Sequence, residues 1–148
     1  MKLTDDWFTV LSESDSGNLI YITGRNRLDE FRKSGKMKER LEIVWRYEGN
    51  MPPDEQSMQM EQVQELLQKA VEKDKLAILT GIYTGNGERC WVFYTRTVRV
   101  FCERLNEALS SLPTLPLELS AEIDADWEEY LDMYSAYKEE GGDDNDDE

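Results

Sequence analysis

The strongest constraint on the fold is a tight turn, Asn86-Gly87, between two apolar runs of β-strand composition. Both turn residues tolerate a positive φ, which the two-residue turn of a β-hairpin requires. Residues 76–83 precede the turn and residues 88–95 follow it, so the segment is predicted to form a hairpin.

A two-residue loop fixes which side chains share a face of this hairpin. It places Tyr83 opposite Cys90 and Ile82 opposite Trp91. One face then carries Leu79, Gly81, Tyr83, Cys90, Val92 and Tyr94, and the other carries Ile78, Thr80, Ile82, Trp91 and Phe93. Because both faces are apolar, other elements are expected to cover each of them.

The segments around the hairpin predict an α+β fold. Residues 40–48 alternate as a strand with Leu41, Ile43, Trp45 and Tyr47 on one face, and helices are predicted from Asp54 and from Thr97. Residues 117–119 read as a short last strand. The resulting βαββαβ order over residues 40–121 is the split βαβ of a ferredoxin-like core with an antiparallel sheet.

Two further elements flank this core. Residues 7–11 and 19–23 predict an N-terminal β-hairpin, and a C-terminal helix is predicted with Asp124 or Asp126 as its cap. Both are candidates to cover the sheet face that the two central helices leave open. Residues 1–138 are therefore predicted to form a single domain, and residues 139–148 a disordered acidic tail.

Charge and residue usage exclude several classes of function. The net charge is −15, and seven of the 15 excess acids are accounted for by the last ten residues. This field disfavours nucleic acid and anionic membranes as partners and favours a basic protein. Histidine is absent, which removes the commonest general base and zinc ligand, so no catalytic residue, metal or cofactor is predicted.

The cellular compartment is predicted from what the chain lacks. It has no apolar run long enough to cross a bilayer and no signal-peptide pattern at its start. Its two cysteines, Cys90 and Cys102, lie within apolar patterns and read as small core residues rather than a redox pair. These features predict a cytoplasmic protein of undetermined oligomeric state.

Motifs between residues 41 and 130 resemble those of the bacterial domain-of-unknown-function family 695. The pieces are Trp45 and Tyr47, Met51-Pro52, Thr84-Gly85-Asn86-Gly87, Arg89, Trp91, Phe93-Tyr94, Leu105-Asn106, Ala108-Leu109, Leu115-Pro116-Leu117 and Asp124 to Tyr130. The resemblance implies a fold but no activity. At fold level the arrangement is similar to the regulator of ribonuclease activity B family, whose members inhibit a ribonuclease by binding it.

Two functional hypotheses follow. The first is a non-catalytic interaction or regulatory domain that binds a basic protein partner. The second is a small-molecule or anion-binding pocket, and a possible enzyme, that uses Arg89 near the turn at residues 84–89. The candidate ligand-binding residues are Arg89, Trp91, Tyr94, Trp45, Asp126 and Trp127. The plainer alternatives are favoured for two of them, with Arg89 paired to a nearby acid at a hairpin tip and Asp126 serving at the start of a helix.

Overall fold

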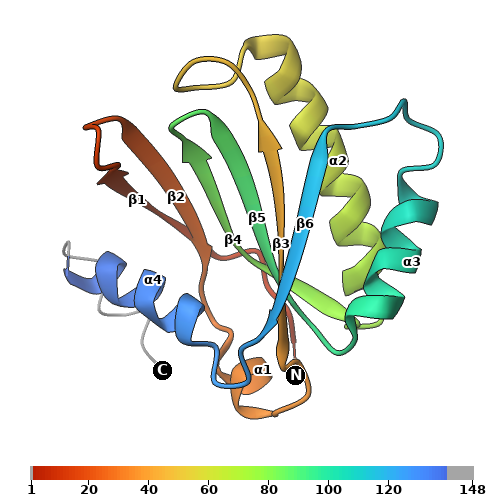
Figure 1. Cartoon of the computed structure of the whole chain (residues 1–148). Helices are drawn as coiled ribbons and strands as arrows, with labels where there is room; N and C mark the ends of the chain where they lie inside the picture. Colours follow the sequence, from red (N-terminus) through yellow and green to blue (C-terminus); the bar gives the residue numbers. More distant parts are fainter. Residues whose placement is uncertain (1, 140–148) are drawn as a thin grey trace.

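A computed structural model describes residues 2–139, which form six strands and four helices (Figure 1). Their order is β1 (Trp7–Glu13), β2 (Leu19–Arg25), α1 (Asp29–Lys33), β3 (Glu39–Arg46), α2 (Asp54–Glu72), β4 (Ala77–Gly85), β5 (Glu88–Thr95), α3 (Val98–Ala108), β6 (Leu117–Ile123) and α4 (Glu128–Glu139). The predicted acidic tail lies outside the described residues, except for Glu139. Within residues 2–139, no helix has both the length and the apolar character needed to span a membrane.

All six strands pair antiparallel in one sheet with the order β1-β2-β4-β5-β3-β6. The four strands β4-β5-β3-β6 and helices α2 and α3 reproduce the predicted ferredoxin-like βαββαβ core. The N-terminal hairpin has a different role from the one expected of it. It covers no face, because β2 pairs with β4 and so extends the sheet by two strands.

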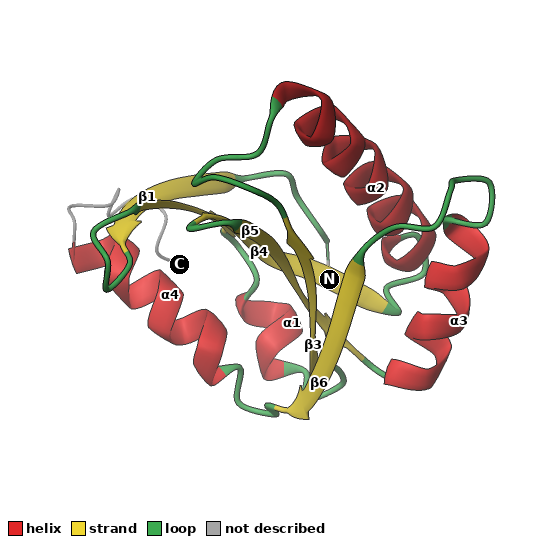
Figure 2. Cartoon of the chain, turned by 45° about the horizontal axis from the view of Figure 1, so that its top comes forward, coloured by secondary structure: helices red, strands yellow, loops and turns green. Residues whose placement is uncertain are grey.

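Helices cover both faces of the sheet, as Figure 2 shows, with α2 and α3 on one side and α1 and α4 on the other. Leu41, Ile43 and Trp45 of β3 point toward α2 and α3, so the predicted alternation is confirmed. The second core, under α1 and α4, contains Phe8 of β1 and Trp127 at the start of α4. The prediction that α4 covers the face opposite the central helices is therefore confirmed.

The turn at residues 86–87 has the predicted geometry. Asn86 has φ of 56° and Gly87 has φ of 86°, and Tyr83 lies opposite Cys90. Gly85, with φ of 147°, lies so close to β2 that a Cβ atom there would be 2.4 Å from the Leu19 carbonyl oxygen. The turn is thus held against the N-terminal hairpin by a contact that only glycine permits.

A β-bulge in β4 places two residues of the hairpin on the faces opposite to those predicted. The register shifts between Leu79 and Gly81, so Leu79 lies opposite Phe93 and packs under α2 and α3. Ile78 lies opposite Tyr94 and packs on the other side. The assignment of Ile78 and Leu79 was therefore wrong, because the extra residue of a bulge moves every side chain beyond it to the opposite face.

Candidate functional site

The sheet separates the six residues predicted to bind a ligand. Trp45 and Trp91 are buried under α2 and α3, and Arg89 points to the same side. Tyr94 and Trp127 stack on each other on the opposite side, with ring centroids 4.3 Å apart. Asp126 is exposed in the loop before α4. These residues therefore do not converge on one pocket.

Arg89 is engaged with its neighbours in the fold. Its Nε donates to the Thr84 hydroxyl at 2.9 Å, and its Nη1 lies 3.3 Å from a carboxylate oxygen of Glu61 on α2. The side chain is only 11% exposed. Arg89 therefore pairs with a nearby acid, Glu61, as one of the two alternatives predicted. The neighbours that the ligand-binding alternative required, Tyr94, Asp126 and Trp127, do not lie beside it.

Asp124 holds the start of α4, which confirms one of the two predicted caps. Its carboxylate accepts hydrogen bonds from the amides of Glu128 at 2.8 Å and Glu129 at 3.2 Å. The Tyr94 hydroxyl and Arg40 Nη1 each donate to Asp124 Oδ2 at 2.7 Å. Burial alone would raise the pKa of Asp124, but these hydrogen bonds hold it below its ordinary value.

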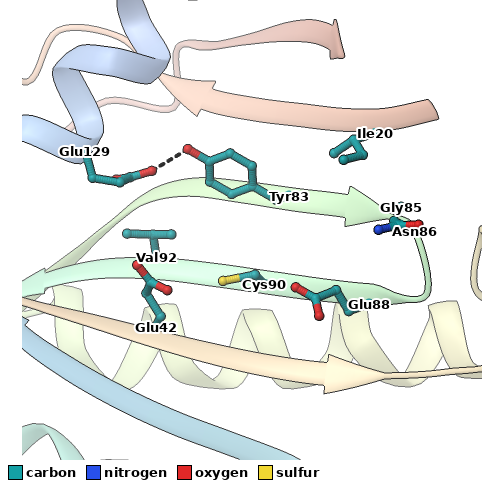
Figure 3. A pocket seen from close by; sticks show the side chains of 9 residues that line it. All are labelled: Ile20, Glu42, Tyr83, Gly85, Asn86, Glu88, Cys90, Val92 and Glu129. Carbon is teal, nitrogen blue, oxygen red and sulfur yellow. Dashed lines mark hydrogen bonds between the residues drawn. The ribbon is translucent and has the colours of Figure 1, made fainter. Parts of the chain in front are cut away.

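One concave site among the described residues lies on the α4 side of the sheet, next to the turn at residues 86–87. It is a groove of about 460 Å³ on the part of this face that α4 leaves uncovered. Its lining consists of Ile20, Glu42, Tyr83, Gly85, Asn86, Glu88, Cys90, Val92 and Glu129 (Figure 3). We call this the acidic groove, because three glutamates from β3, β5 and α4 surround an apolar floor.

The acidic groove lies in a region of excess negative charge. Alternate side chains of β3, β5 and β6 point to this face of the sheet. Two further carboxylates come from the start of α4, namely Asp124, which caps the helix, and Glu129 in its first turn. The charged groups are Glu42, Glu88, Glu118, Glu122, Asp124, Glu129, Arg40 and Arg46. These six carboxylates and two guanidinium groups give this described region a formal charge of −4.

The two arginines are already shared among several acids. Arg40 contacts Glu42 at 2.9 Å, and it also pairs with Asp124 and Glu122. Arg46 is 3.0 Å from Glu118 and 3.8 Å from Glu88. The local charge is therefore not neutralised by these pairs.

Glu129 is the most constrained of the three groove glutamates. The Tyr83 hydroxyl donates to its Oε2 across the groove wall (Figure 3). Its Oε1 is buried and has no hydrogen-bond partner among residues 2–139. Burial raises the pKa of the Glu129 carboxyl, the bond from Tyr83 opposes this, and the charge of Glu42 raises it further.

Cys90, on the floor of the acidic groove, is a thiol rather than a thiolate. Burial raises its pKa to about 12, and the charges of Glu42, Glu88 and Glu129 contribute to this shift. A thiol with this pKa is a poor nucleophile near neutral pH. The part of the chain that the structure describes also has no group of three or more Cys, Asp or Glu side chains placed to hold a metal ion.

The acidic groove was not predicted from the sequence, although Tyr83, Cys90 and Val92 were correctly placed on one face of the hairpin. One signal was available. Glu88 occupies the same face as Cys90 and Val92, and a charged residue on an otherwise apolar face indicates incomplete cover. The contribution of Glu129 depends on where α4 docks, which no local pattern encodes.

Comparison with known proteins identifies the family but no activity. The profile of a family of unknown function, DUF695, matches residues 5–134. No significant match is found among curated proteins or among solved structures. Since the match spans most of the chain, this protein belongs to the DUF695 family.

Proposed function

We propose that this protein is a non-catalytic binding domain for a basic protein partner, and that the acidic groove is its recognition surface. The observation that carries the proposal is the combination of a cavity of about 460 Å³ with a surrounding formal charge of −4. We further propose that it acts in the cytoplasm, where Cys90 and Cys102 stay reduced, since both are free cysteines.

The acidic groove offers a basic partner two kinds of interaction. Its carboxylates attract a cationic surface over a distance of about 10 Å at moderate salt, which raises the rate of encounter. Its floor of Ile20, Cys90 and Val92 offers apolar contact once the partner has docked. Lysine and arginine side chains suit such a site, because they combine apolar stems with charged ends.

A binding role is also favoured over catalysis by the chemistry of the groove. The chain contains no histidine. The Cys90 thiol has a pKa of about 12 and is protonated near neutral pH. The Tyr83 hydroxyl donates a hydrogen bond to Glu129, and burial raises the pKa of that hydroxyl above its usual range. Neither the Cys90 thiol nor the Tyr83 hydroxyl is therefore tuned to exchange a proton near pH 7.

Affinity capture from native cell lysate, at low and at high salt, tests the proposal. Glu42→Gln/Glu88→Gln removes two charges from the acidic groove. Glu65→Gln/Glu107→Gln removes two charges from exposed positions on α2 and α3 and is the matched control. We expect salt-sensitive capture of a basic protein by the wild type and the control, and loss of that capture in the groove variant.

Two results would refute the proposed function. One is the absence of any salt-sensitive partner at low salt. The other is equal capture by the groove variant and the control, which would assign the attraction to overall charge. By analogy of fold with the regulator of ribonuclease activity B family, a ribonuclease is the first type of partner to examine.

A further inference from the structure

Glu129 Oε1 is one of several buried side-chain atoms that have no hydrogen-bond partner among residues 2–139, and it is the one that belongs to a residue lining the acidic groove. A buried acceptor without a donor costs free energy, and native proteins retain few of them. A glutamine at this position would also accept the Tyr83 hydrogen bond through its amide oxygen, without a charge to bury. The charge of the carboxylate is therefore more than the fold requires, and a cationic group bound in the groove that Glu129 lines would compensate it.

The acidic groove can supply the other contacts that such a donor needs. Glu129 comes from α4, Glu42 from β3 and Glu88 from β5, so three carboxylates reach the cavity from different elements. Between them lie Val92, Cys90 and the ring of Tyr83. The site thus combines an apolar floor and an aromatic ring with acceptors that lie in several directions.

We infer that the acidic groove takes one arginine side chain of the partner, with its guanidinium group facing the carboxylates that line the cavity; this inference rests on the function proposed above. A guanidinium group has five donors in a planar fork and can bridge carboxylates from separate elements. It is more weakly hydrated than an ammonium group and stacks on aromatic faces, here on Tyr83. Lysine would supply a charge, but neither the fork nor the flat face.

A peptide titration tests the choice of arginine. The probe is a capped tripeptide with arginine between two isoleucines, and its companions carry lysine or neutral citrulline in place of arginine. Chemical shifts of the Cys90 and Glu129 amides report binding at the groove. We expect the arginine peptide to bind. The lysine and citrulline peptides should bind at least about tenfold more weakly, which is the affinity lost with one charge-assisted hydrogen bond.

Glu129→Gln tests the residue without disturbing its shape. If the carboxylate serves a ligand, this variant unfolds at a higher temperature than the wild type, because it no longer buries a charge. It also binds the arginine peptide roughly tenfold more weakly. A purely structural role for Glu129 does not predict a higher unfolding temperature combined with weaker binding of the peptide. Glu65→Gln, with the same loss of charge on exposed α2, should leave both quantities at the wild-type value.

The outcomes separate this inference from the function on which it rests. Equal binding of the arginine and lysine peptides, no binding of the arginine peptide at the groove, or undiminished binding by Glu129→Gln would each overturn the arginine assignment. If Glu42→Gln/Glu88→Gln still loses its lysate partner in those cases, the acidic groove remains the recognition surface for another feature of that partner. If that variant captures the partner normally, the proposed function itself fails.

Discussion

Replacing Asp124 by alanine should loosen α4 from the sheet, because one carboxylate joins three parts of the fold. It accepts from two amides at the start of α4, from Tyr94 on β5 and from Arg40 on β3. Alanine removes all of these acceptors at once. It leaves the buried Tyr94 hydroxyl without its acceptor and Arg40 with only its contacts to Glu42 and Glu122.

The expected cost combines a lost cap with a weakened ion pair. Loss of an N-cap costs about 0.5–2 kcal/mol. Breaking a buried ion pair costs about 3–5 kcal/mol, but Arg40 is 17% exposed and retains two acids, so a smaller share applies. We expect Asp124→Ala to lower the free energy of unfolding by about 3 kcal/mol in total, with the melting temperature lower by roughly 6–12 °C.

Asp124→Asn separates the cap from the charge. Asparagine is as good a cap as aspartate, so this variant should lose only about 1–2 kcal/mol, chiefly from its charge-assisted bonds. Because the pKa of Asp124 is lowered in the fold, its stabilising effect is present above its ordinary value of 3.8 and is lost as the pH falls below it. The difference between wild type and Asp124→Asn should therefore shrink at acid pH.

Urea unfolding at pH 7 and at acid pH, followed by tryptophan fluorescence, measures these differences. Trp127 lies at the start of α4 and stacks on Tyr94, so the signal reports this region. Asp132→Ala, at an exposed position of α4, controls for loss of an acid from the helix. If Asp124→Ala is no less stable than Asp132→Ala, the account of how α4 is held is wrong.

Three further predictions concern the sheet face under α4. Because the pKa of Glu129 is raised in the folded protein, the free energy of unfolding of the wild type should fall as the pH rises from 4.5 through that pKa. Glu129→Gln should lack this fall in urea unfolding measured across the same pH range, and an equal fall in both proteins would contradict the assignment. Gly24→Ala should cost about 1–3 kcal/mol in the same assay, since its Cβ would lie 2.3 Å from the Phe8 ring, and a cost near zero would mean that the ring moves freely. Under native conditions a thiol reagent should modify Cys102, which is partly exposed, well before the buried Cys90. Mass spectrometry of the digested protein measures this order, and modification of Cys90 first would contradict the prediction.

Local patterns were sufficient for most of the core. The Asn86-Gly87 turn and the alternation of residues 41–47 depend on neighbours in sequence and were predicted correctly, and Asp124 is one of the two caps predicted for the last helix. The last strand, predicted over residues 117–119, extends to Ile123 because β3 pairs with it along its length. Pairing with a distant strand thus sets where β6 ends.

The six residues predicted to bind a ligand lie on two sides of the sheet because their positions also depend on the tertiary structure. Arg89 and Tyr94 are five residues apart in β5, and an odd separation in a strand places their side chains on opposite faces. Trp127 and Trp45 were grouped with them because their types suit a binding pocket. Strand alternation sets the face of Trp45, but only the docking of α4 decides that Trp127 joins the core on the other side of the sheet.

The sequence by itself determined the order of strands and helices and the acidic character of the protein, because turn chemistry, periodicity and charge are properties of short segments or of composition. Only the tertiary structure decided that the N-terminal hairpin extends the sheet and that α4 covers just part of one face. The acidic groove arises from that partial cover, which brings Glu129 beside Tyr83 from 46 residues away. Such a site depends on contacts between distant segments, and these are set by the packing of the whole chain.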